Sequence, residues 1–360
     1  MPRVLFIATH RPARTPNQRF RFEQYMPYLE QNGFQCDLSY IVEESDDAFL
    51  YKPGHLVKKV GFIARSFSKR QADVARMNDY DIIFICREAL MTRSTFFERK
   101  FASGRARTIY DFDDSIWLSN VSEANRKWKF IKDPGKTSKI IGMVDMVFAG
   151  NDYLAGYARQ FNSNVTVIPT TIDTDEYHPI DARKEDGPVC IGWSGSITTI
   201  QHFQYARPAL LKLKERFGDR ITIRVIGDPQ FKDEELGISG MKWQRDTELQ
   251  DLSAIDIGIM PLPDDEWARG KCGLKGLQYM GMGIPPVMSP VGVNTKIVQD
   301  GVNGFLAGPV EEWVEKISRL VEDAELRGRM GAAARRTVEE KWSVKAWRGE
   351  YLRLFREVMG

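Results

Sequence analysis

The chain has 360 residues, 42% of them hydrophobic and 28% charged, with a formal net charge of +2 at pH 7. This length exceeds what one hydrophobic core usually serves, so we expect two domains. The nearly neutral charge gives no reason to expect a nucleic acid partner. The apolar segments are too short for a signal peptide or a membrane span, so we expect a cytoplasmic protein.

The cysteines lie far apart, and none belongs to a CxxC or histidine-rich motif; they are Cys36, Cys86, Cys190 and Cys272. Three of them lie in apolar runs that resemble buried strands. We therefore expect reduced core thiols, not a disulfide framework or a zinc site.

In the first half of the chain, short apolar runs alternate with polar turns and helical segments. The runs cover residues 4–8, 36–41, 82–86, 108–111, 146–149 and 165–168. They are rich in β-branched and aromatic residues and do not alternate with polar ones, as is typical of parallel strands covered on both faces. The pattern predicts a doubly wound α/β domain over residues 1–178.

A polar segment, residues 179–188, interrupts this alternation of strands and helices and is predicted to be a linker. The strand–helix rhythm then resumes and predicts a second doubly wound domain over residues 189–340, with a cleft between the two domains. Residues 341–360 have helical apolar spacing and predict a final amphipathic helix. In such sheets ligands bind beyond the carboxyl ends of the strands, so we expect the chemistry on those loops.

The loop after the first strand is rich in arginine and contains no acid. Its cations are Arg11, Arg14, Arg19 and Arg21, and Asn17 and His10 lie among them. Guanidinium groups bind phosphate and carboxylate well, which predicts an anionic ligand. A solvated arginine face explains the same pattern, and a single histidine is more often structural.

Residues 55–71 combine apolar and basic residues at helical spacing. Such a helix can lie on an anionic membrane surface, with the protein peripheral on its inner face. It can equally be a crossover helix packed on the sheet with its charges in water, and the sequence leaves both interpretations open.

Three aspartates follow another apolar run, in YDFDDSIW at residues 110–117: Asp111, Asp113 and Asp114. A metal would need further ligands from elsewhere, and we predict none. The carboxylates are expected at the cleft floor, in contact with ligand hydroxyls, and helix capping is the alternative.

Two glycine-containing loops of the second domain suit a nucleotide. WSGSITT, residues 193–199, offers Gly195, Ser196 and Thr198 directly after a strand, and Gly227 follows the next strand. Small residues and hydroxyls at such turns offer anion contacts, although helix capping alone explains the hydroxyls.

The segment RGKCGLKGLQYMGMGIPPV, residues 269–287, places Lys271 and Lys275 at the start of a predicted helix. The main-chain N–H groups of Cys272, Gly273 and Leu274 would point out of the helix N-terminus, where phosphate binds readily. We predict a diphosphate site here; a solvated basic loop is the alternative.

The second half, from IGWSGS through RVIGDP and residues 256–292 to DGVNGFLAGP, resembles the donor domain of family 4 retaining glycosyltransferases. The resemblance extends over nearly the whole chain. It implies the GT-B fold, in which two Rossmann-like domains face each other, with the final helix crossing back to the first domain. It also implies that a UDP or GDP sugar donates to a glycan or lipid-linked acceptor in cell-surface polysaccharide or glycoconjugate synthesis, with retention and without a required cofactor.

The resemblance assigns roles to residues singled out above and adds Trp243 and Gln278. The donor would contact Gly195, Ser196, Thr198, Gly227, Trp243, Cys272, Gly273, Leu274 and Gln278. Catalysis would rest on Lys271, Lys275, Asp111 and Asp113. The acceptor would contact Arg14, Asn17, Arg19, Arg21 and Asp114.

The chain departs from this family at two glutamates. Gly270 stands at the first, which contacts the donor sugar, and Gln278 stands at the second, which holds the ribose. The family's basic residues after the first donor-domain strand are also missing, so we expect Lys271 and Lys275 to supply that charge. A catalytically silent sugar-nucleotide-binding or scaffold protein is the alternative, whereas the absence of GxGxxG after the first strand disfavours a dehydrogenase or epimerase.

Overall fold

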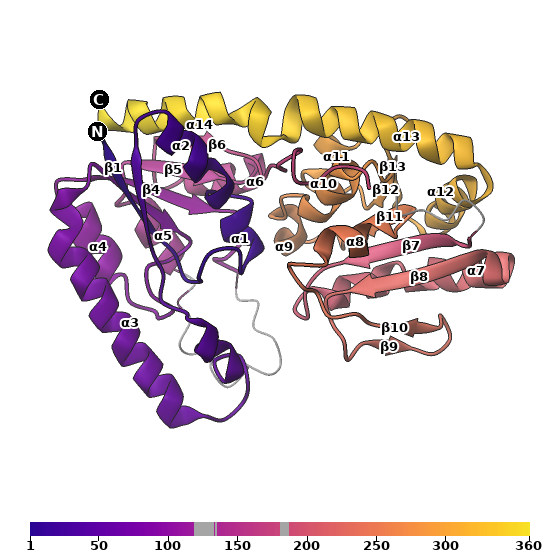
Figure 1. Ribbon diagram of the computed structural model, residues 1–360, viewed down its shortest axis with the longest axis horizontal. Helices are drawn as coiled ribbons and strands as arrows, with labels where there is room; N and C mark the ends of the chain where they lie inside the picture. The colour runs from indigo at the N-terminus through magenta and orange to yellow at the C-terminus, as the bar shows by residue number, and fades with distance from the viewer. Residues whose placement is uncertain (119–132, 134, 181–186) are drawn as a thin grey trace. The chain divides into compact units, whose positions relative to one another are not determined.

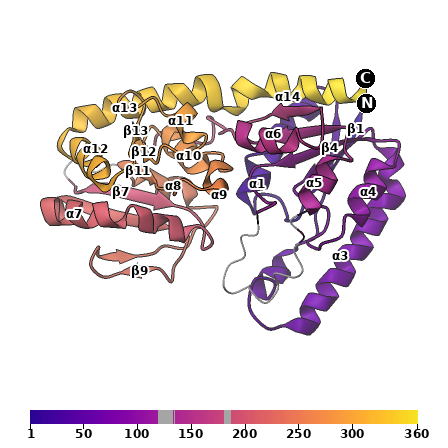
Figure 2. The same cartoon turned by 180° about the vertical axis from the view of Figure 1, so that it is seen from behind.

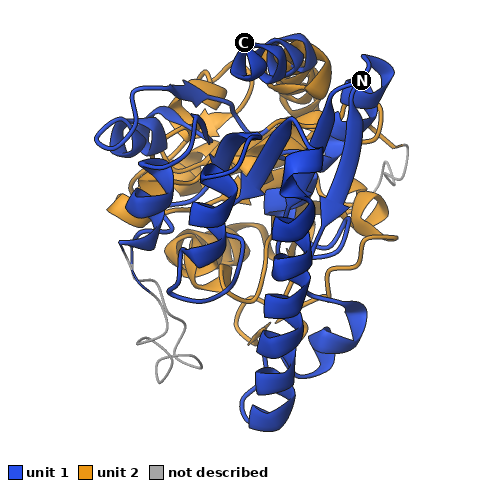
Figure 3. Ribbon diagram, turned by 90° about the vertical axis from the view of Figure 1, so that its left-hand side faces the viewer, with its two compact units in different colours: residues 1–170, 348–360 blue, residues 171–347 orange. Residues whose placement is uncertain are grey.

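The computed structural model of the protein describes residues 1–118, 133, 135–180 and 187–360 (Figure 1). Residues 181–186 of the expected linker 179–188 lie outside the described residues. The chain forms two compact units: unit 1 holds residues 1–170 and 348–360, and unit 2 holds residues 171–347 (Figure 3). Within the described residues, no helix has both the length and the apolar character that a membrane crossing needs.

Unit 1 is built on a parallel sheet in the order β2-β1-β3-β4-β5-β6, which confirms the predicted doubly wound arrangement. Its strands are β1 (Arg3–Ile7), β2 (Gln35–Ser39), β3 (Ile82–Cys86), β4 (Arg107–Phe112), β5 (Met146–Ala149) and β6 (Val165–Val167). Its helices include α1 (Pro16–Arg19), α2 (Met26–Gln31), α3 (Leu56–Arg76), α4 (Phe96–Ala102), α5 (Lys136–Ile141) and α6 (Asp152–Ala158). Helix α3 extends well beyond the sheet in both views of the chain (Figures 1 and 2).

The last helix, α14 (Val344–Met359), begins in unit 2 and ends in unit 1. Its aromatic residues explain why its second half packs in unit 1. The ring of Tyr351 stacks on Tyr25 with centroids 4.2 Å apart, and Phe355 lies 6.2 Å from Phe6 and 6.0 Å from Phe84. Stacked aromatic pairs add stabilisation beyond the area they bury.

Unit 2 has a second parallel sheet in the order β13-β12-β11-β7-β8. Its strands are β7 (Val189–Ser194), β8 (Ile221–Ile226), β11 (Ile257–Met260), β12 (Pro286–Met288) and β13 (Phe305–Leu306), with a separate hairpin of β9 (Lys232–Asp233) and β10 (Ile238–Ser239). Its helices include α7 (Arg207–Phe217), α8 (Glu248–Ser253), α9 (Glu266–Arg269), α10 (Leu274–Gly281), α11 (Asn294–Ile297), α12 (Val310–Glu322) and α13 (Ala324–Thr337).

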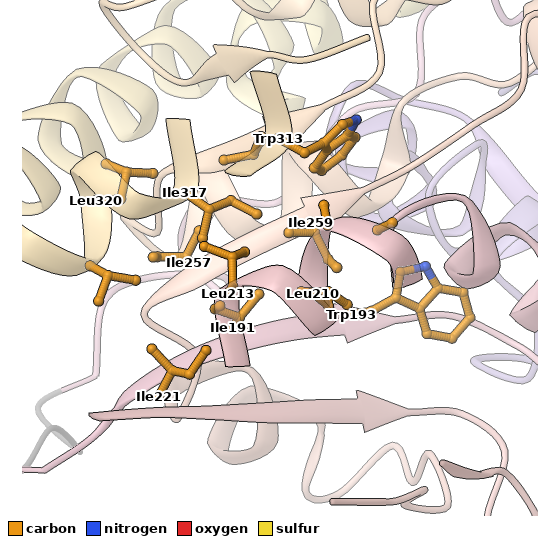
Figure 4. Packing of buried hydrophobic residues seen from close by; sticks show 14 of the residues in the cluster. Ile191, Trp193, Leu210, Leu213, Ile221, Ile257, Ile259, Trp313, Ile317 and Leu320 are labelled. Atoms are coloured by element: carbon orange, nitrogen blue, oxygen red, sulfur yellow. The ribbon is translucent and has the colours of Figure 1, made fainter. Parts of the chain in front are cut away.

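The core of unit 2 lies between one face of its sheet and helices α7 and α12 (Figure 4). Ile191, Ile257 and Ile259 point from the strands toward Leu213 of α7 and Ile317 of α12, and all five are fully buried. Because side chains alternate along a strand, Gly192 and Gly258 face the opposite side of the sheet. Helix α10 packs on that opposite face, where the ring of Tyr279 lies against Gly258.

In both units the strand order reverses between the first and third strands of the sheet. These reversals lie between β1 and β3 in unit 1 and between β7 and β11 in unit 2. Ligands of doubly wound sheets bind at this switch point, beyond the carboxyl ends of the strands. The fold therefore places the candidate site of each unit on the loops that follow these strands.

Candidate functional site

The loops after β7 and β8 touch each other through glycine backbone, beside the switch point of unit 2 that lies between β7 and β11. A Cβ atom on Gly227 would lie 2.3 Å from the carbonyl oxygen of Gly195, and Gly227 has a φ of +133°. A Cβ atom on Gly195 would lie 2.2 Å from Cη2 of Trp193. Both positions therefore require glycine, and the peptide N–H of Gly195 donates to Ile226 O at 2.9 Å.

Hydroxyl groups in the loop after β7 bind one another. Ser196 Oγ lies 2.9 Å from Thr198 Oγ1, and the N–H of Ser196 donates to Thr199 Oγ1 at 3.0 Å. The short helix that follows, Ile200–Tyr205, receives no side-chain capping hydrogen bond from Thr199. Ser196 and Thr198 are exposed at this loop.

Helix α10 is fastened closely to the sheet, and this fixes where its N-terminus lies. Tyr279 Oη accepts a hydrogen bond from the N–H of Ser194 at 2.7 Å, and the Tyr279 ring occupies the space that a side chain at Gly258 would fill. A Cβ atom on Gly276 would likewise lie 2.5 Å from Met288 Sδ. The start of α10 is thereby held beside the end of β7.

The N-terminus of α10 begins at a left-handed residue, Gly273, with a φ of +71°. A Cβ atom there would lie 2.2 Å from Ile297 Cδ1, so the close approach also excludes a side chain. No acceptor in the described part of the chain takes a hydrogen bond from the N–H groups of Gly273 or Leu274. The N–H groups of Gly273 and Leu274 therefore lie at the helix end for which we predicted an anion site, next to the buried Cys272.

The two lysines occupy different places at this helix end. Lys275 Nζ lies 5.4 Å from the ring centroid of Trp193, directly beside the loop that contains Gly195. Lys271 Nζ lies 5.0 Å from the ring centroid of Trp267, on α9. The structure therefore brings Lys275 to the glycine loops of β7 and β8, while Lys271 lies on the α9 side of the helix end.

Gln278 and Trp243 complete the predicted donor residues. Gln278 is buried on α10, and its Nε2 donates to Glu248 Oε1 at 3.0 Å. Trp243 is half-buried, not a core residue, and it follows Met241, whose carbonyl accepts a hydrogen bond from the N–H of Gly227 at 2.7 Å. Trp243 therefore lies two residues after Met241, which is hydrogen-bonded to the glycine loop that follows β8.

In unit 1, Asp111 and Arg21 do not occupy a ligand surface, contrary to expectation. Asp111 Oδ1 lies 2.5 Å from Arg21 Nη2, and the two side chains are 1% and 0% exposed. Arg21 Nη1 also donates to the carbonyl of Ile168. Burial raises the pKa of Asp111, and the guanidinium opposes that shift. Because neither side chain reaches the surface, we remove both from the candidate site and assign them a structural role.

Asp113 and Asp114 share one arginine that the sequence did not single out. Arg87 Nη2 lies 2.6 Å from Asp113 Oδ1 and 2.9 Å from Asp114 Oδ2. Arg87 directly follows β3 and has a φ of +62°. The sequence feature that could have identified Arg87 is its position as a charged residue directly after a buried strand. No group of three or more His, Cys, Asp or Glu among the described residues is arranged to hold a metal ion.

The arginine-rich loop is also matched by an acid, which comes from another segment. Arg11 Nη2 and Arg14 Nε lie 2.9 Å and 3.1 Å from Asp47 Oδ2. Although burial acts in the opposite direction, the hydrogen bonds from these arginines lower the pKa of Asp47. The loop is therefore neither a bare cationic surface nor a solvated face, which weakens the expectation of an anionic ligand.

The remaining predicted residues of this loop are more enclosed. Arg19 is 7% exposed, with its guanidinium 4.8 Å from the ring centroid of Phe20. Asn17 Nδ2 lies 3.7 Å from Cys86 Sγ at the end of β3. His10 Nε2 lies 2.5 Å from Tyr51 Oη, and burial, followed by the charge of Arg14, lowers the pKa of His10 to about 4. Asn17 and His10 therefore mark the switch point between β1 and β3.

Comparisons with known proteins identify a matching family model and similar folds. Residues 188–323 match the family model described as glycosyl transferases group 1. A search of the curated proteins finds no match. Among solved structures, sucrose-phosphate synthase from Thermosynechococcus elongatus is similar with a TM-score of 0.68 at 13% identity, covering 99% of both chains.

Two further similar structures contain nucleotides. HepE from Anabaena, solved with UDP-glucose, has a TM-score of 0.67 at 14% identity and covers 99% of both chains. The pneumococcal O-GlcNAc transferase GtfA, solved with UDP and GlcNAc, has a TM-score of 0.60 at 14% identity, covering 82% of this chain and 60% of that one. Residues 188–323 therefore match the family model of glycosyl transferases group 1, and the chain as a whole has the GT-B fold.

Proposed function

We propose that the protein is a family 4 retaining glycosyltransferase that moves a sugar from a nucleoside-diphosphate sugar to a glycan or lipid-linked acceptor. One arrangement carries this proposal: the N-terminus of α10, with Lys275 beside it, meets the glycine loops of β7 and β8 beside the switch point. The similarity to structures solved with UDP and UDP-glucose supports a UDP sugar, and a GDP sugar is the second candidate.

The diphosphate would be bound by peptide dipoles and cations together. The N–H groups of Cys272, Gly273 and Leu274 would donate to the phosphate oxygens, and Lys271 and Lys275 would neutralise the charge that grows on the leaving group. Ser196 and Thr198 would add hydroxyl contacts. Trp243 would flank the base, and Gln278 would hold the ribose.

Transfer with retention requires no side-chain nucleophile in this proposal. The acceptor hydroxyl attacks from the face that the diphosphate leaves, and the departing diphosphate accepts its proton. The chain then contributes charge stabilisation and exclusion of water, which would otherwise hydrolyse the donor. Asp113 remains a proposed catalytic residue, Asp114, Arg14, Arg19 and Asn17 remain the proposed acceptor contacts, and no metal is required.

Thermal unfolding with UDP, GDP and their sugars tests the proposal. A ligand that binds the folded state raises the melting temperature according to its affinity, so a nucleoside diphosphate should stabilise the protein and adenosine should not. Transfer or hydrolysis of the stabilising donor by purified protein separates the enzyme from a silent sugar-nucleotide-binding protein. Absence of stabilisation by every nucleoside diphosphate would contradict the proposal.

We further propose that α3 attaches the protein to the inner face of a membrane as a peripheral protein. It carries several exposed apolar side chains, of which Val57 is 86% exposed; they are Leu56, Val57, Val60, Ile63 and Phe67. Its exposed charges are basic, since its one acidic residue, Asp73, is buried against Arg70. This combination suits an anionic bilayer and places the enzyme near a lipid-linked acceptor in polysaccharide or glycoconjugate synthesis.

Co-sedimentation with vesicles tests this attachment. Wild-type protein should bind anionic vesicles and lose that binding in high salt, and Val57→Asp with Val60→Asp should bind about tenfold less. Val302→Asp is the matched control, because Val302 is exposed by 49% in unit 2 and should leave binding unchanged. Equal sedimentation of the α3 variant and the wild type would contradict the attachment.

A further inference from the structure

The side-chain amide of Gln278 is held by two buried partners within unit 2. Its Nε2 lies 3.0 Å from Glu248 Oε1 and 3.3 Å from Tyr177 Oη, and Gln278 is 5% exposed. Glu248, the first residue of α8, is 4% exposed, and its Oε2 accepts a hydrogen bond from Tyr177 Oη at 2.9 Å. The three side chains form a closed triangle of hydrogen bonds.

The carboxylate of Glu248 determines the orientation of this amide. An ionised carboxylate only accepts hydrogen bonds, whereas a glutamine offers a donating nitrogen and an accepting oxygen. Arg245 Nη1 forms an ion pair with Glu248 Oε2 at 3.4 Å. Turning the amide would bring two acceptor oxygens together and remove the hydrogen bond. Nε2 therefore faces Glu248, and among the described residues none donates a hydrogen bond to Gln278 Oε1.

The free acceptor lies close to the phosphate-binding end of α10. Gln278 follows Lys275 by three residues, so the two side chains are neighbours on the helix surface. In a nucleoside diphosphate the ribose is joined directly to the phosphates, and its hydroxyl groups are hydrogen-bond donors. An acceptor about one helical turn from the phosphates therefore meets the chemistry of the ribose.

Resting on the nucleotide site proposed above, we propose that Glu248 is a positioning residue that fixes the Gln278 amide so that Oε1 accepts a hydrogen bond from a ribose hydroxyl. Gln278 then offers the ribose an accepting oxygen, as a carboxylate would, but adds no negative charge beside the diphosphate. Glu248 carries that charge instead, where Tyr177 and Arg245 compensate it.

Exchanging the two residues tests the direction of the hydrogen bond. Gln278→Glu alone places two carboxylates against each other and should weaken UDP binding by about tenfold or more. Adding Glu248→Gln supplies a donor at position 248, so the carboxylate at position 278 regains its partner and still offers an oxygen to the ribose. The double variant should recover most of the affinity. Glu248→Gln alone leaves the Gln278 amide free to take either orientation, so it should weaken UDP binding, but less than Gln278→Glu does.

The decisive measurement is the preference for ribose, obtained by calorimetry with UDP, 2′-deoxy-UDP and 3′-deoxy-UDP. The wild type should bind at least one deoxy analogue about fivefold more weakly than UDP, which corresponds to one hydrogen bond. The double variant should keep that ratio. If Gln278 donated to the ribose instead, the carboxylate at position 278 could not replace it, and the ratio would fall to one.

The proposal is overturned if the folded double variant, checked by its melting temperature, binds UDP without a ribose preference. It is also overturned if the wild type binds UDP and both deoxy analogues equally. These results differ from failure of the proposed function, in which the wild type binds neither UDP nor GDP at all.

Discussion

Asp111 Oδ1 and Arg21 Nη2 form a buried ion pair at 2.5 Å, within unit 1. Breaking such a pair leaves one charge uncompensated in the interior. We expect Asp111→Asn to lower the free energy of unfolding by about 3 kcal/mol, measured by urea denaturation, with nucleotide affinity unchanged. Glu325→Gln, which removes the exposed Glu325–Arg329 pair, is the control and should change stability by about 0.5 kcal/mol or less. A stable Asp111→Asn variant without transferase activity would return Asp111 to the catalytic site.

Removing the cations at the start of α10 should weaken nucleotide binding. Lys275→Ala should lower the affinity for UDP by about tenfold, because it removes a charged contact to phosphate, and Lys271→Ala should add to this loss. Calorimetric titration measures both. Lys212→Ala is the matched control, since Lys212 pairs with Glu311 on α12 in the same unit. Unchanged affinity in the double lysine variant would contradict the diphosphate site.

A methyl group at Gly227 should separate the two loops that contact there. Gly227→Ala places its Cβ atom 2.3 Å from the Gly195 carbonyl oxygen at a φ that alanine rarely adopts. We expect the loss of at least 2 kcal/mol of stability or, if the loops move apart, about a tenfold loss of UDP affinity. Gly328→Ala, in the open on α13, should be neutral or slightly stabilising. Normal stability and affinity in Gly227→Ala would contradict the loop packing.

His10 should make the protein less stable as the pH falls. Burial, and then the charge of Arg14, lower its pKa from 6.5 to about 4. Between those pH values the unfolded chain binds a proton at His10 that the folded chain does not. The contribution of His10 to the free energy of unfolding is therefore fully present above pH 6.5 and is lost as the pH falls toward 4. The decline should be on the order of 2 kcal/mol and should be smaller in His10→Asn, measured by urea unfolding across that range. Identical pH profiles for the two proteins would contradict it.

The strands and the start of α10 were predictable because their signals are local. The apolar runs at 82–86 and 146–149 are β3 and β5, and the expected helix start at Leu274 is that of α10. Sequence spacing also indicated the glycine loops, because only glycine permits backbone contact of that kind.

The charge pairing in unit 1 was not predictable, because its partners come from distant segments. Asp47 is more than thirty residues from Arg14, and Arg87 reaches Asp113 from the end of another strand. The sequence of an arginine-rich loop predicts a cationic surface, because the acidic residues that pair with the arginines lie in other segments. The burial of Asp111 was hidden for the same reason, since only the packed sheet shows which aspartate of the DFDD motif points inward.

The contact between Gly258 and the ring of Tyr279 couples two positions that are distant in sequence. A bulkier residue at 258 would lift α10 off the sheet and withdraw its amides and Lys275 from the phosphates. Homologues that enlarge position 258 should therefore carry a smaller residue at 279, and would then need another acceptor for the N–H of Ser194. Covariation of positions 258 and 279 would indicate that the position of the α10 N-terminus is under selection.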